Sequence, residues 1–254
     1  MLIPVYNHER TLVSLLDRLK LNEMKGKSAK SIANALELLR RIMNFGIKRR
    51  LCAGPGFAIK LPRVDNVKTE DLTRAELARL VAVLDGHIQT RSSRASGAAM
   101  MKLVLFTGMR RGEMFRLKWS DLDFNRNNIL LREPKGGGNV VIPMSSHARL
   151  LLESLRSGGE YLFPGRGGNQ RRDIRKQVNA IKAESGLPAD FRPLHGLRHV
   201  FASGLISSGV EFQLVQRLLT HKGGTVTHRY AHIRDDALRD AAELAAELAE
   251  QVKA

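Results

Sequence analysis

Tyr230 stands in a stretch of the sequence where side chains that can act on a phosphate are gathered. The stretch Thr227-His-Arg-Tyr-Ala-His232 surrounds this tyrosine, one of only three, with polar and basic groups. A tyrosine is most often a core or rim residue whose hydroxyl is hydrogen-bonded. A phenol among cations is also a candidate nucleophile, because a neighbouring base or a cationic field can activate it.

Two further motifs bring arginines to candidate phosphate sites. His195-Gly-Leu-Arg198 places two side chains on one face at the start of a helix, where the planar fork of Arg198 suits two phosphate oxygens. Thr107-Gly-Met-Arg-Arg-Gly-Glu113 joins a glycine break to a new helix. The structural alternatives are a surface ion pair for the first motif and a helix dipole complemented by Glu113 for the second. The functional interpretation makes one arginine of the second motif another phosphate clamp, held by Glu113.

Lys135 and His221 are the remaining candidates. Lys135 lies in the glycine-rich turn Pro134-Lys-Gly-Gly-Gly138, where a lysine is either exposed decoration or a cation on a flexible arm. A lysine near a phosphate can donate a proton to a leaving oxygen. His221 has no cysteine or carboxylate partner at ligand spacing, so no metal site and no cofactor are expected.

The composition points to an anionic partner. The 254 residues carry a formal net charge of +17, and 43% of them are apolar, enough for a folded core. Nucleic acid is the default partner of so basic a chain, and an anionic membrane is the alternative. No apolar run approaches the roughly 20 residues of a membrane-spanning helix, and no signal peptide is recognisable. Cys52 is the only cysteine, which excludes an internal disulfide and fits the cytoplasm.

The elements that must position these side chains are mostly helical. Apolar residues at helical spacing predict a helix over 28–50, and a capping box at Thr73 and Glu76 starts another. Further helices are expected at 97–106, up to Leu117, and at 146–156, 171–185, 196–208, 211–219, 224–231 and 234–251. Two β-like runs at 128–132 and 139–143 predict a hairpin. The predicted fold is mainly α with one small antiparallel β element.

Basic residues cluster at two places outside these motifs, and we predict that both contact DNA phosphates rather than serve as solvated faces. The residues are Arg40, Arg41, Lys48, Arg49 and Arg50 in the first helix, and Arg171, Arg172 and Arg175 further along.

Three stretches resemble the phage integrase, or tyrosine recombinase, family. They are T-G-M-R-R-G-E-M-F-R-L-K-W-S-D-L-D at 107–123, L-H-G-L-R-H-V-F-A-S at 194–203 and L-L-T-H-K-G-G-T-V-T-H-R-Y-A-H at 218–232. They occur in the family's order and at its usual separations, and the resemblance covers roughly residues 69–235. Three such stretches with a hairpin lysine between the first two are highly specific.

The resemblance implies a role for each matching residue. Arg110 and Arg198 are the catalytic arginines, and Glu113 is the structural support of Arg110. Lys135 matches the general acid, His195 the family histidine that precedes Arg198 by three residues, His221 the position that holds His or Trp, and Tyr230 the nucleophile.

The resemblance also implies an activity and its partners. It predicts a site-specific recombinase that cleaves double-stranded DNA at a specific site and rejoins it through a 3′-phosphotyrosyl link, without metal or ATP. The expected setting is integration or excision of a mobile element or phage, in a bacterial or phage protein of the cytoplasm and nucleoid. A homotetramer in the synapse and DNA-bending accessory proteins are expected as partners.

The resemblance predicts a catalytic domain over 71–254, a linker over 63–70 and part of an N-terminal helical DNA-binding domain over 1–62. One departure stands out, because the family usually has Leu-Gly-His where this chain has Leu219-Thr220-His221. A β-branched residue in place of glycine puts the local turn and the role of His221 in question.

Three other functions remain open at this stage. A DNA-binding regulator is suggested by a loose helix-turn-helix spacing over 201–219, and a type IB topoisomerase or a catalytically silent family member would share the motifs. The amphipathic tail from 235 also has two interpretations. Its apolar stripe either packs on its own domain or docks on a neighbouring protomer.

Overall fold

The chain divides into two compact units, Met1–Thr69 and Glu70–Ala254. This division falls inside the linker expected at 63–70, while the roles assigned to the two pieces stay predictions. The computed structural model describes residues 26–52, 58–64, 71–134, 137–155, 158–220 and 235–253.

The first unit contains helix α2, Ala29–Lys48, in agreement with the helix expected over 28–50. It begins at Ser28, whose side-chain oxygen accepts a hydrogen bond from the backbone N–H of Ser31 at 3.2 Å. Ala33, Leu36 and Met43 form its buried face. The five basic residues predicted to contact DNA are all exposed, and one of them, Arg40, pairs with Glu37.

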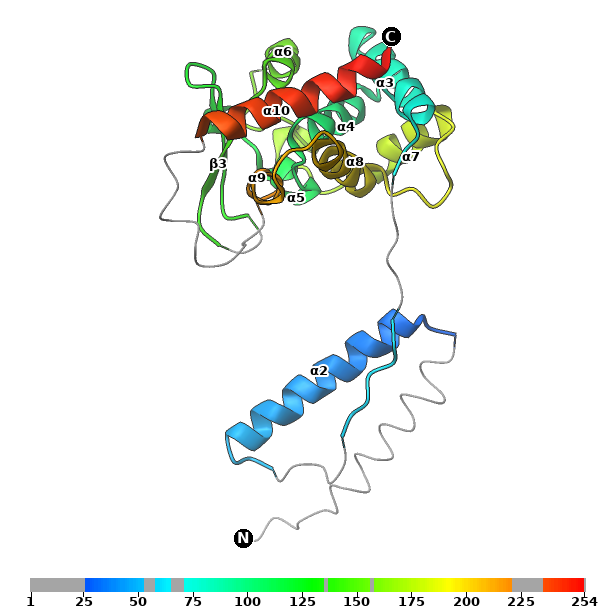
Figure 1. Cartoon of the computed structure of the whole chain (residues 1–254), viewed down its shortest axis with the longest axis vertical. Helices are drawn as coiled ribbons and strands as arrows, with labels where there is room; N and C mark the ends of the chain where they lie inside the picture. The colour runs from blue at the N-terminus through cyan, green and yellow to red at the C-terminus, as the bar shows by residue number, and fades with distance from the viewer. Residues whose placement is uncertain are drawn as a thin grey trace. The chain divides into compact units, whose positions relative to one another are not determined.

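Helix α4, Ala95–Thr107, forms the centre of the second unit. All but three of its residues are buried, as expected for a helix that is apolar on every side. Figure 1 shows it surrounded by other helices, and it packs against α3, α6, α7, α8 and α10. These neighbours span Arg74–Gln89, Ser146–Ser154, Arg175–Glu184, Pro193–Ser207 and Asp235–Glu250.

A small antiparallel sheet lies beside the helices, with strands β1, Leu122–Asp123, β2, Asn128–Leu131, and β3, Val140–Pro143, in that order. The predicted hairpin of β2 and β3 is confirmed, with Ile129 paired to Ile142 and both buried. Strand β1 was not predicted, because two residues are too few to show an alternating pattern. The mainly helical fold with one small antiparallel β element is therefore as expected.

The other predicted helices within the described residues lie where they were expected, but most of their first and last residues differ from the predicted ones. Helix α7 starts at Arg175 rather than at 171, because the Asp173 carboxylate accepts a hydrogen bond from the Arg175 N–H at 2.9 Å. The helix expected at 224–231 lies outside the described residues. The short elements that complete the second unit are α5, Arg111–Arg116, α9, Phe212–Leu218, and the 3-10 turns Trp119–Asp121, Arg166–Gly168 and Gln251–Lys253.

The tail helix α10 packs on its own unit, against α4, α6, α8 and α9 (Figure 1). Its apolar stripe, with Leu238 and Ala242 among its members, belongs to the core. The edge of the helix is held as well, because Glu243 accepts hydrogen bonds from both the backbone N–H and the hydroxyl of Ser146, each at 2.7 Å. The structure thus has the tail packed on its own domain, and docking on a neighbouring protomer stays a prediction.

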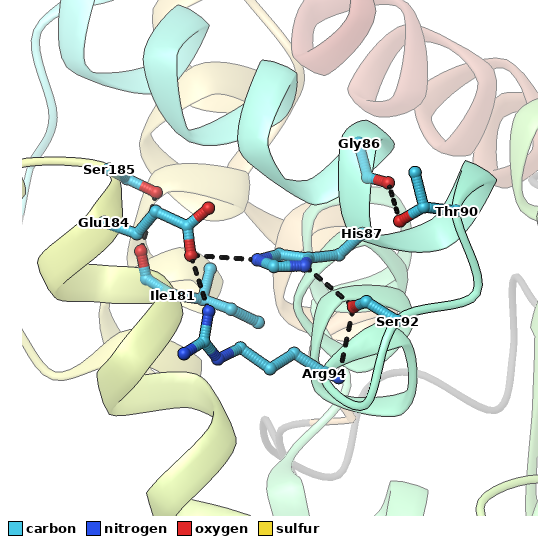
Figure 2. A network of polar contacts seen from close by, with 8 residues as sticks. All are labelled: Gly86, His87, Thr90, Ser92, Arg94, Ile181, Glu184 and Ser185. Atoms are coloured by element: carbon cyan, nitrogen blue, oxygen red, sulfur yellow. Dashed lines mark hydrogen bonds and ion pairs between the residues drawn. The ribbon is translucent and has the colours of Figure 1, made fainter.

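A polar network joins three helices at the edge of this unit (Figure 2). His87, in α3, contacts the Ser92 hydroxyl through Nδ1 at 2.8 Å and the Glu184 carboxylate through Nε2 at 3.0 Å. Arg94, which precedes α4, donates to the same Glu184 oxygen at 3.0 Å. The network therefore ties the end of α7 to the turn between α3 and α4.

None of the described helices is long and apolar enough to cross a membrane.

Lys102 should make a large contribution to the stability of this unit. Its side chain is 12% exposed, and its ammonium pairs with Asp85 at 2.5 Å and Glu250 at 2.8 Å, which links α4 to α3 and α10. Lys102→Met removes this cation from beside two largely buried carboxylates, and we expect a loss of about 3 kcal/mol in the free energy of unfolding. Urea unfolding measures this loss.

The matched control is Arg175→Met, which removes a fully exposed ion pair with Asp173. This variant should unfold at the same urea concentration as the unmodified chain. Equal effects of the two substitutions would contradict the role of Lys102.

A candidate phosphate-binding active site

Among the predicted site residues that the structure describes, Arg198 is the most deeply buried cation. It lies in α8 with a relative exposure of 8%. Its Nη1 donates to the carbonyl of Gly108 at 2.5 Å, and its Nη2 donates to the carbonyl of Leu219 at 2.6 Å. These carbonyls belong to the C-caps of α4 and α9. Helix C-termini favour positive charge, so two helix ends hold the guanidinium in place.

Burial, together with the positive charge of Arg110, lowers the pKa of Arg198 to about 10, while the negative charge of Glu113 opposes this shift. The side chain nevertheless stays protonated at neutral pH. Because Arg198 keeps its positive charge where water is largely excluded, it interacts strongly with an anion.

Arg110 is held by a different set of contacts. It is the N-cap residue of α5, and its backbone N–H donates to Glu113 Oε2 at 2.8 Å. Its Nη1 donates to Glu113 Oε1 at 3.0 Å and to Thr220 Oγ1 at 2.7 Å. Within the described part of the chain Nε and Nη2 of Arg110 have no partner, and its side chain is 27% exposed. The Arg110 side chain is therefore only partly enclosed by the described residues, and the expected contact with Glu113 is present.

Two glycines allow the helices to approach closely around these arginines. Gly108 ends α4 with a φ of +62°, and a Cβ there would lie 2.6 Å from the Phe201 ring and 2.9 Å from the Leu219 side chain. Gly196, inside the predicted His195 to Arg198 motif, would bring a Cβ within 2.4 Å of the Phe191 ring. The glycines of both motifs therefore serve packing.

His195 is exposed and has a histidine neighbour that sequence reasoning missed. Its Nε2 lies 3.1 Å from Nε2 of His199, one turn further along α8, and the rings meet edge to face. One of these nitrogens must carry the proton of the shared hydrogen bond. The signal was available in the sequence, because residues four apart share one face of a helix.

Lys135, His221 and Tyr230 lie outside the described residues. Described residues next to two of them, Lys135 and His221, line one pocket of about 200 Å³. Pro134 and Gly137 line it from the hairpin, and Thr220 lines it from the end of α9. The described residues of the hairpin and of the end of α9 therefore meet at one place, where Thr220 contacts Arg110.

The second predicted DNA-contacting cluster is divided by the structure. Arg171 donates to the Pro164 carbonyl at 2.6 Å, and burial lowers its pKa. Arg172 is exposed, and Arg175 pairs with Asp173 at 2.9 Å. Arg171 and Arg172 line one open groove, together with Arg166, which the sequence reasoning did not single out.

Among the described residues no group of three or more His, Cys, Asp or Glu side chains has the arrangement to hold a metal ion.

The model of the phage integrase family matches residues 70–237. The chain belongs to this family. The match contains all three stretches on which the resemblance was based, and the expected family is therefore confirmed. Its members, the tyrosine recombinases, are enzymes that cut and rejoin DNA strands.

Curated relatives agree with the family. The chain is 30% identical over 218 residues to tyrosine recombinase XerC of Xanthomonas axonopodis pv. citri, with 82% of this chain and 69% of the relative covered. It is 30% identical over 229 residues to tyrosine recombinase XerC of Oceanobacillus iheyensis, with 84% and 73% covered. For three XerC proteins of Xanthomonas campestris the chain spans 66% of their length.

Solved structures of recombinases share the fold. XerH recombinase bound to a palindromic difH substrate matches with a TM-score of 0.66 at 22% identity, covering 92% of this chain and 71% of that one. The Tn1549 transposon integrase in complex with circular intermediate DNA also gives 0.66, at 20% identity, with 90% and 83% covered.

Gly108 should be required for the site as well as for the fold. Gly108→Ala combines a strained φ with a collision against the Phe201 ring, and we expect a loss of about 3 kcal/mol in the free energy of unfolding. The Gly108 carbonyl also moves away from Arg198, so the site should be disturbed. Urea unfolding measures the loss in stability.

Gly209→Ala is the matched control, because Gly209 has a φ of +83° with open space around it. It carries the backbone strain alone and should lose about 1 kcal/mol. Equal losses in the two variants would show that the close approach to Phe201 does not matter.

Proposed function

We propose that this chain is a site-specific DNA recombinase that cleaves and rejoins DNA through a 3′-phosphotyrosyl link to Tyr230. The observation that carries the proposal is the pair of arginines. Arg198 is buried and held by two helix-end carbonyls, and Arg110 is held by Glu113 through Nη1 while its side chain stays 27% exposed. Fixed cations of this kind stabilise the charge that gathers on a phosphate in a five-coordinate transition state.

The family resemblance supplies the reacting groups around this clamp. Tyr230 attacks the phosphorus through its phenol oxygen. Its unperturbed pKa near 10 leaves it protonated at neutral pH, so His195 or the cationic field must help to remove the proton. The 5′ oxygen of DNA leaves and takes a proton from Lys135. His221 takes the position that holds His or Trp in the family.

The reaction needs no external energy source. One phosphodiester bond breaks as the phosphotyrosyl bond forms, so the bond energy is kept and ATP is not required. Attack by a 5′ hydroxyl from another strand releases Tyr230 and completes the exchange. Because the two arginines stabilise the phosphate charge, the proposed chemistry uses neither a metal nor a cofactor.

The proposed substrate is double-stranded DNA, which the net charge of +17 favours. Recombination joins two duplexes, and we propose a tetramer on DNA, like the lambda integrase tetramer bound to a Holliday junction. DNA-bending accessory proteins are proposed as further partners. Integration or excision of a mobile element or phage is the proposed setting. The 30% identity to XerC proteins favours a second setting, in which this chain acts as a XerC-like recombinase.

A nicked suicide substrate tests the central step, because loss of a short fragment prevents religation and traps the covalent intermediate. We expect a protein–DNA adduct that maps to Tyr230 by mass spectrometry of the digested complex. Tyr230→Phe lacks the nucleophilic oxygen and should form no adduct while retaining DNA affinity.

Tyr161→Phe, which keeps the ring that packs near Lys118, is the matched control and should form the adduct normally. A DNA-binding regulator predicts affinity without any adduct, and a topoisomerase predicts an adduct with relaxation of supercoils as its main product. An adduct that survives Tyr230→Phe would overturn the proposal.

The basic face of α2 should contribute to DNA affinity in a salt-dependent way. Arg41 and Lys48 are both exposed on this helix. If each neutralises one phosphate, the double variant Arg41→Ala/Lys48→Ala should reduce the slope of log affinity against log salt by about 2. Lys30→Ala, an exposed lysine of the same helix outside the predicted cluster, serves as control. An unchanged slope in the double variant would show that these two residues do not contact DNA phosphates.

A further inference from the structure

Thr220 occupies a backbone conformation that does not suit its side chain. Its φ is +53°, in the left-handed region that favours glycine, and a β-branched residue there is an outlier. The residue is also buried, with a relative exposure of 9%. Such conformations persist only where the surroundings compensate for the strain, and they concentrate at functional sites.

The hydroxyl of Thr220 makes the compensating contacts. Its Oγ1 accepts a hydrogen bond from Arg110 Nη1 at 2.7 Å and lies 3.4 Å from Glu113 Oε1, to which it donates. Arg110 Nη1 also donates to the same Glu113 oxygen at 3.0 Å. The three side chains therefore close a small ring in which the guanidinium is held from two sides.

The same turn also holds the other arginine. The carbonyl of Leu219 accepts a hydrogen bond from Arg198 Nη2 at 2.6 Å, one residue before Thr220. The turn is closed by the Thr220 N–H, which donates to the Arg217 carbonyl at 2.9 Å. Two consecutive residues after α9 thus contact both guanidiniums, one through its backbone and the other through its side chain.

We propose that Thr220 is a positioning residue for Arg110, and that its hydroxyl orients the guanidinium for the scissile phosphate. The inference rests on the proposed function, because it assigns a role within that phosphate clamp. Glu113 alone holds the guanidinium by one hydrogen bond, about which it can still rotate. A second acceptor on the same nitrogen removes that freedom, and preorganised charge is what stabilises a transition state.

The test compares Thr220→Val with Thr220→Ser on the suicide substrate at saturating DNA. Valine has the shape and β-branching of threonine, so it keeps the backbone strain and removes only the hydroxyl. We expect adduct formation to slow by about tenfold or more, because Nη1 of Arg110 loses one of its two acceptors and the guanidinium is held less firmly. DNA affinity should change by less than about twofold, because DNA binding draws on many phosphate contacts and positioning acts on the reaction step. Serine restores the hydroxyl and should recover the rate.

Two results would overturn the inference. One is a valine variant that forms the adduct at the rate of the unmodified chain. The other is a serine variant as slow as valine, which would assign the effect to packing of the methyl group. Thermal melting monitors folding, and if the valine variant is unfolded, Thr220→Ala is compared with serine under the same two criteria.

Thr90→Val is the matched control for loss of a threonine hydroxyl, since Thr90 donates to the Gly86 carbonyl at the exposed end of α3. It should leave the rate unchanged. Absence of any adduct from the unmodified chain would refute the proposed function and this inference with it. An adduct that forms normally in the unmodified chain and equally fast in the valine variant would refute this inference alone.

Discussion

The buried charge of Arg198 is the constraint on which the rest of the site depends. A guanidinium removed from water must find acceptors inside the protein, or its burial would destabilise the fold. The acceptors are two main-chain carbonyls at helix ends, from Gly108 and Leu219. Both helices must therefore end where they do, and both turns must aim an oxygen inward. The glycine at 108 follows from this demand, since only a residue without Cβ can take that φ beside Phe201.

The second arginine, Arg110, places another positive charge close to that of Arg198. Burial and repulsion from Arg110 both lower the pKa of Arg198. The protein therefore holds two like charges close to each other where water is partly excluded. One buried carboxylate, that of Glu113, offsets part of the repulsion. A phosphate with two negative oxygens would offset the rest. Because the cations are fixed before a ligand arrives, little reorganisation is needed when charge develops during reaction.

The sequence predicted the parts of this arrangement that depend on local patterns. The capping box at Thr73 and the contact of Arg110 with Glu113 each join residues three positions apart, and the hairpin joins two strands that directly follow each other in the sequence. The contacts of Arg198 with carbonyls 90 and 21 positions away do not follow, because a main-chain acceptor carries no mark in the sequence. Thr220 shows the same limit. Its departure from the family pattern was visible, but its bond to Arg110 depends on how α9 ends against α5.

Helix α10 shows why an apolar stripe predicts burial without predicting the partner. The stripe from Leu238 onward was compatible with a neighbouring protomer as well as with its own domain. Its members are mostly alanines, and small side chains allow a helix to approach α4 and α8 closely, where bulkier neighbours such as Phe201 fill the space. Polar residues along the edges of α10 then determine the position of the helix. Glu243 contacts Ser146 and Glu250 contacts Lys102 on the same unit, so polar contacts at the middle and at the C-terminal end of the helix hold it in this packing.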